Sequence, residues 1–86
     1  MNDRSRFDTD DYKAVLALCI VLMKEPRGIV LGELRVRPQV LYQRGEEHLE
    51  PLMCGSSFDV AYMAVGILGA REVRNALTKM KQQVTR

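Results

Sequence analysis

An uninterrupted apolar run from Ala14 to Met23 constrains this chain more than any other feature, because it is the largest block of apolar surface in the sequence. Three leucines and two alanines in the run, with aspartates just before it, favour a helix over a buried strand. Asp8 or Thr9 is the expected N-cap. The helix should end near Lys24, since the residue before Pro26 resists the helical conformation. Whatever covers this helix decides the fold.

The apolar segments are too short to cross a bilayer. The first run has ten residues, and the run of residues 58–70 is interrupted by Asp59, whereas a spanning helix needs about 20 apolar residues. The first residues are acidic rather than purely basic, and the two cysteines are too few for a disulfide-rich secreted domain. We therefore expect a cytoplasmic protein without membrane contact.

The length and charge distribution predict one small domain. With 86 residues, the chain can build only one core, so we expect a flexible leader at residues 1–7 and one domain at residues 8–86. Residues 1–12 hold four aspartates against two arginines, and residues 51–86 hold five basic side chains against two acidic ones, within a net charge of +2. Helix ends that complement their dipoles account for this polarity more simply than an anionic partner does.

After the turn at Pro26 and Gly28, the periodicity changes from helical to alternating. Val30, Leu34 and Val36 fall on one side of residues 28–37, with charged residues on the other, which predicts one half-buried strand. Residues 38–44 form either a second strand, with a hairpin bend at residues 37–39, or a helical turn. Residues 45–51 are polar and read as a loop.

The C-terminal third predicts further helix. Ser56 and Asp59 form a capping-box pattern, so a helix should run from Ser57 to Leu68. Residues 71–81 are amphipathic, and we expect either one long kinked helix from 57 to about 83 or two helices hinged at Gly66 to Ala70. The resulting fold class is α+β, with the order α-β-β-α or α-β-β-α-α.

Neither catalysis nor ligand chemistry is predicted. His48, the only histidine, and Cys54 lack an orienting third group and an oxyanion motif. The glutamates near His48 read as a solvated loop, and the glycines match neither a P-loop nor a dinucleotide fingerprint. We therefore expect no enzyme, no metal site and no cofactor.

Self-association is the function that the residues favour most. A helix that is apolar on all sides needs cover that so small a domain can hardly supply. We expect a homodimer with Val15, Leu18, Leu22, Met63 and Ile67 at the protein interface. The predicted function is that of a small regulatory or interaction protein, an inhibitor or adaptor of the kind that phages and other mobile elements carry.

A dimeric DNA-binding regulator is the alternative. Arg35 and Arg37 of the hairpin, or Arg71 and Arg74 of the last helix, would contact nucleic acid. Nucleic acid is not the favoured partner, because the net charge is low and the basic residues are spread along the chain.

Overall fold

The computed structural model describes residues 9–84, and the expected leader at residues 1–7 lies outside them. Helix α1 (Thr9–Lys24) is followed by four strands and two further helices. The later elements are β1 (Ile29–Leu31), β2 (Leu34–Arg37), β3 (Val40–Gln43), β4 (Met53–Cys54), α2 (Ser57–Leu68) and α3 (Ala70–Val84). The α+β class is confirmed, with two C-terminal helices rather than one.

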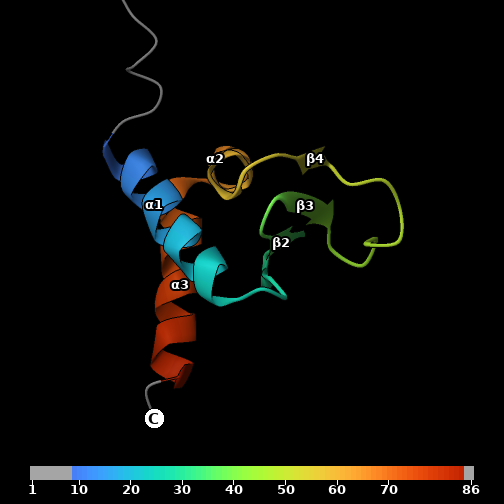
Figure 1. Cartoon of the computed structure of the whole chain (residues 1–86). Coiled ribbons are helices and arrows are strands. Elements are labelled where there is room, and N and C mark those ends of the chain that lie inside the picture. Colours follow the sequence, from blue (N-terminus) through green and yellow to red (C-terminus); the bar gives the residue numbers. More distant parts are fainter. Residues whose placement is uncertain (1–8, 85–86) are drawn as a thin grey trace, which may run out of the picture.

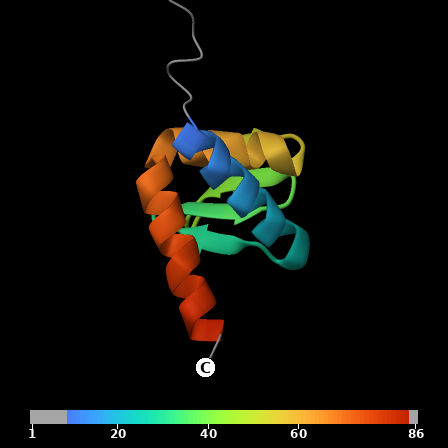
Figure 2. The ribbon, with the colours of Figure 1, turned by 90° about the vertical axis from the view of Figure 1, so that its left-hand side faces the viewer.

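The four strands form one antiparallel sheet in the order β1-β2-β3-β4. Helix α2 packs on β2, β3 and β4, while α1 packs on both α2 and α3. In Figure 1 the α1–α3 pair lies on the left and the sheet on the right, with α2 at the top between them. Turned by 90°, the molecule shows α1 crossing in front, α2 along the top and α3 down one side (Figure 2).

The predicted strand at 28–37 is wrong, because a hairpin divides it. Gly32 has a φ of 57° and opens a two-residue turn with Glu33, as the first residue of a type II′ turn requires. The turn pairs Leu31 with Leu34 and Val30 with Arg35. Val30 therefore points away from the core, and not to the same side as Leu34 as a continuous strand would place it.

The next turn settles residues 38–44 as a strand rather than a helical turn. Pro38 and Gln39 connect β2 to β3, and Gln39 takes a φ of 74° without being glycine. Proline followed by a residue of positive φ is the pattern of a type II turn. The short strand β4 was not predicted. Two backbone hydrogen bonds hold the residues on either side of it against β3 and the turn before β3: the Leu52 N–H donates to Leu41 O at 2.7 Å, and the Gly55 N–H donates to Gln39 O at 3.0 Å.

The capping box predicted for α2 is confirmed. The Asp59 N–H donates to Ser56 Oγ at 3.0 Å, and the Ser56 N–H donates to Asp59 Oδ2 at 3.1 Å. At the other end, the Gly69 N–H bonds Val65 O at 2.7 Å, and Gly69 adopts φ 93° and ψ 146°. This positive φ breaks the helix, so that α3 leaves in a new direction (Figure 2).

The core lies between the sheet and the helices and is wholly apolar among the described residues. Its fourteen buried members are Ala14, Val15, Leu18, Leu22, Ile29, Leu31, Leu34, Val36, Leu41, Val60, Ala61, Ala64, Val65 and Val73.

Candidate interaction surfaces

Three of the five residues predicted for a protein interface are core residues instead. Val15 and Leu18 are fully buried and Leu22 is 1% exposed, because α1 turns this side toward the other helices. They cannot contact a partner while the domain keeps this fold, so that part of the prediction is wrong. The remaining two, Met63 and Ile67 on α2, are 40% and 52% exposed.

A different side of α1 carries the exposed apolar residues. Tyr12, Leu16, Ile20 and Met23 are exposed by 49%, 39%, 53% and 78%. Their spacing of four, four and three residues places them in one line along the helix. We call this line the α1 stripe. Sequence reasoning found the helix but not this side of it, because a run with no polar residue does not show which side faces water.

Three of the exposed apolar residues are aromatic. Tyr12 lies in the α1 stripe, while Phe58 and Tyr62 are 39% and 46% exposed on α2, with ring centroids 6.3 Å apart. Among the described residues, no aromatic side chain belongs to the buried core. Aromatic side chains on the surface are typical of protein interfaces, where they bury a large area at little entropic cost.

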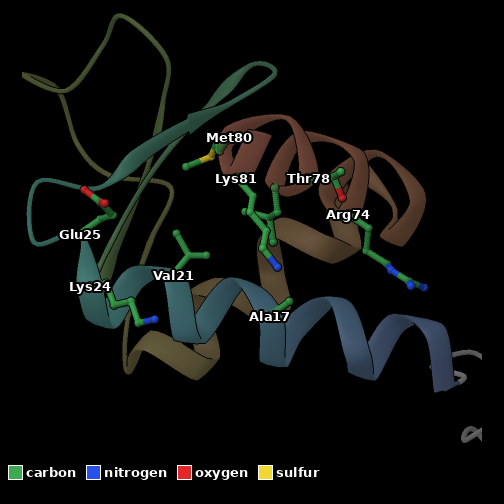
Figure 3. A pocket seen from close by; sticks show the side chains of 9 residues that line it. Ala17, Val21, Lys24, Glu25, Arg74, Thr78, Met80 and Lys81 are labelled. Atoms are coloured by element: carbon green, nitrogen blue, oxygen red, sulfur yellow. The ribbon is translucent and has the colours of Figure 1, made fainter. Parts of the chain in front are cut away.

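A groove of about 460 Å³ runs between α1 and α3 (Figure 3). Its lining combines apolar and charged side chains: Ala17, Val21, Lys24, Glu25, Arg74, Leu77, Thr78, Met80 and Lys81. The volume is within the range of small-molecule sites. Its charged groups are of both signs, and the Arg74 guanidinium reaches Asp10 Oδ1 at 3.4 Å.

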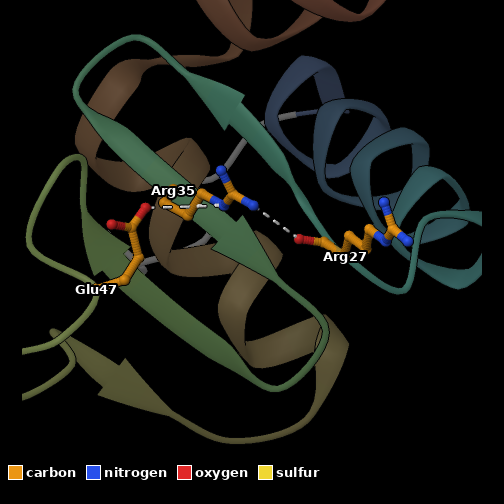
Figure 4. Close-up of polar contacts among 3 residues, drawn as sticks. All are labelled: Arg27, Arg35 and Glu47. Atoms are coloured by element: carbon orange, nitrogen blue, oxygen red, sulfur yellow. Dashed lines mark hydrogen bonds and ion pairs between the residues drawn. The ribbon is translucent and has the colours of Figure 1, made fainter.

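The hairpin arginines lie on the face of the sheet turned away from α2, and both are engaged within the domain. Arg35 Nε is 3.8 Å from Glu47 Oε2, and Arg35 Nη2 donates to the backbone oxygen of Arg27 at 3.2 Å (Figure 4). The Arg37 guanidinium lies 5.7 Å from the centre of the Tyr42 ring, within the range of a cation–π contact. Residues 27–50 hold four arginines and four glutamates, so this segment has no net charge.

Arg71 and Arg74 lie on α3, and both are exposed. The structure therefore does not bring the four arginines of the DNA-binding alternative together: two belong to β2 and two to α3. The two pairs of arginines therefore belong to two distinct candidate surfaces. Of these two surfaces, only the one on α3 has more basic than acidic side chains.

His48 and Cys54 are both exposed. Among residues 9–84, no three His, Cys, Asp or Glu side chains are grouped so as to hold a metal ion. The other cysteine, Cys19, is partly buried against the core, and this burial raises the pKa of its thiol above the ordinary value. A raised pKa leaves less thiolate, which is the opposite of what a nucleophilic cysteine needs.

Comparison with protein-family models, with curated proteins and with solved structures gave no match. None of the helices within residues 9–84 combines the length and apolar character of a membrane span. Function must therefore be inferred from the surfaces themselves.

Proposed function

We propose that this chain is a small non-catalytic interaction protein of the inhibitor or adaptor type, and that it forms a homodimer through the α1 stripe. The observation that supports this proposal is the line of four exposed apolar side chains, Tyr12, Leu16, Ile20 and Met23. A contiguous apolar line on a helix that already buries its other side is typical of a surface that a partner covers. A cytoplasmic location belongs to the same proposal, because both cysteines are free thiols.

A second copy of the chain is the partner that requires nothing beyond this sequence. Two copies related by a twofold axis would place the α1 stripe of one copy against the same stripe of the other, which is the arrangement of most homodimers. Among the stripe residues none is charged, so self-pairing brings no like charges together.

The size of the stripe sets the strength of the dimer. Burying the exposed parts of the four stripe side chains, with Met63 and Ile67 on α2, contributes about 5–9 kcal/mol from each copy, or about 10–18 kcal/mol for the dimer, taking about 1.5–3 kcal/mol for each fully buried side chain. Association costs about 4–15 kcal/mol in lost motion. The two quantities are of the same order, so the dimer should be weak, with a dissociation constant in the micromolar range.

Light scattering after size exclusion tests the proposal. We expect the wild-type chain to approach the mass of a dimer as its concentration rises to about 100 μM. Ile20→Glu places a carboxylate in the middle of the stripe and should leave a monomer over the same range, because an unpaired charge cannot be buried without a large cost.

Val30→Glu is the matched control. Val30 is 42% exposed, close to the 53% of Ile20, but it lies on the sheet face away from α2. This variant should dimerise like the wild type, and circular dichroism should show that both variants keep their helices. A wild-type monomer at about 100 μM would overturn the proposal. If both variants lost the dimer equally, the stripe would not be the interface.

A further inference from the structure

The outward side of α3 carries four exposed basic side chains, Arg71, Arg74, Lys79 and Lys81. Counting along the helix, its exposed polar residues recur every three or four positions and so share one side of it. They are Arg71, Arg74, Asn75, Thr78, Lys79, Lys81 and Gln82. Val73 is buried and Leu77 and Met80 pack against the core, which fixes the orientation of the helix.

The acidic side chains near α3 do not cancel this charge. Glu72 is the one acidic residue of the helix, and its carboxylate is turned toward the β1–β2 turn, since a Cβ built on Gly32 would lie 2.9 Å from Glu72 Oε2. Asp10 of α1 pairs with Arg74, its Oδ1 lying 3.4 Å from Arg74 Nη1. The α3 side therefore keeps a positive excess, unlike residues 27–50, whose charges balance.

The ion pair between Arg74 and Asp10 leaves Arg74 able to bind another anion. Its side chains are 50% and 70% exposed, and exposed ion pairs of this kind contribute little stability. A phosphate can replace the carboxylate at small cost. Arg35, by contrast, is only 28% exposed and holds both Glu47 and a backbone oxygen.

The shape of the molecule presents α3 to a large partner. The C-terminal half of α3 extends beyond the sheet and the other helices (Figure 2). The helix has 15 residues, or about 22 Å of length, and the major groove of B-DNA is about 12 Å wide and accepts a single α-helix. Basic side chains that flank asparagine and glutamine provide phosphate contacts beside groups that can read base edges.

We propose that the outward side of α3 binds double-stranded DNA, with Arg71, Lys79 and Arg74 contacting phosphates and Asn75 and Gln82 facing the bases. The positive excess of α3 and its extension beyond the domain favour this helix over the hairpin arginines. The proposal does not depend on dimerisation, because one copy of the chain already carries the complete surface.

Fluorescence anisotropy with a labelled 20-base-pair duplex of random sequence tests this site. Three phosphate contacts predict that affinity falls about 40-fold between about 50 and 200 mM salt, from a slope of about −0.9 per contact. The double variant Arg71→Gln/Lys79→Gln removes two of the contacts. It should weaken binding about tenfold or more at ~50 mM salt and make the salt slope shallower by about 2.

The double variant Arg27→Gln/Arg44→Gln is the matched control, because it removes the same charge from exposed positions at the sheet. It should bind the duplex within about twofold of the wild type. Circular dichroism verifies that both variants are folded. Equal weakening in the two variants would show a general effect of net charge and would overturn the assignment to α3.

Two further results would overturn the proposal. The first is an absence of duplex binding by the wild-type chain at ~50 mM salt, where phosphate contacts are strongest. The second is displacement of the bound duplex by polyglutamate at the same charge concentration as by unlabelled duplex, which would identify the α3 side as a site for an acidic protein. Displacement by the duplex alone supports the proposal.

Discussion

At the scale of single residues, Gly28 shows how closely the hairpin packs against the end of α1. Its φ is 83°, and its N–H bonds Glu25 O at 2.8 Å. A Cβ at this position would lie 2.4 Å from Val36 O and 2.6 Å from Arg37 Cγ. Glycine is therefore required at position 28 for two reasons: its backbone angle, and the space that the Val36 carbonyl and the Arg37 side chain occupy.

Gly28→Ala should consequently lower the free energy of unfolding by about 2 kcal/mol or more, since the strain of a positive φ adds to the steric overlap. Gly45→Ala separates the two causes, because Gly45 has nearly the same φ, 82°, with nothing within 4 Å of a new Cβ. It should cost only about 1 kcal/mol. Urea unfolding of the two variants measures the difference, and equal losses would mean that the overlap at Gly28 is relieved without cost.

At the scale of elements, the capping box holds the N-terminus of α2. Ser56 and Asp59 exchange hydrogen bonds of 3.0 and 3.1 Å. Ser56→Ala should lower the free energy of unfolding by about 0.5–2 kcal/mol, because it leaves an N–H of the first turn without its side-chain acceptor. Ser57→Ala, one residue into the helix, keeps both bonds and should be nearly neutral. A loss from Ser57→Ala as large as that from Ser56→Ala would show that the cap contributes nothing.

The helices could be predicted from the sequence because their ends are marked by single residues. Pro26 ends α1, Ser56 begins α2, and Gly69 separates α2 from α3. The division of residues 28–37 into two strands could not be read in the same way. Gly32 followed by Glu33 was compatible with a continuous alternation, and only the pairing of Leu31 with Leu34 shows the hairpin.

The candidate surfaces were predictable in kind but not in position. The apolar run indicated that α1 carries more apolar surface than the domain covers, yet all its residues looked alike. The contacts with α2 and α3 decide that Leu18 is buried and that Ile20, two residues later, is 53% exposed. Tertiary packing, which no local pattern contains, selects the exposed side. The exposure of charged residues is easier to predict, because a charged side chain is rarely buried. Arg71 and Arg74 are indeed exposed.

At the scale of the whole molecule, the domain is thin. Its principal extents are 40, 36 and 20 Å, and its buried core consists of aliphatic residues and alanines among the described residues. A chain of this length buries only about 60–65% of its unfolded surface, so its stability should be modest. Any dimer formed through the α1 stripe would then add a noticeable part of the total stability.

This coupling predicts that the melting temperature depends on protein concentration. Dimerisation stabilises each folded copy by up to about 0.7 kcal/mol per tenfold increase in concentration above the dissociation constant. For a domain of this size, this amounts to a rise of about 3–5 °C in Tm. Thermal unfolding followed by circular dichroism at several concentrations measures it. Ile20→Glu should melt at a temperature independent of concentration, and Val30→Glu should follow the wild type. A constant wild-type Tm above the dissociation constant obtained from light scattering would mean that the stripe is not buried between folded copies.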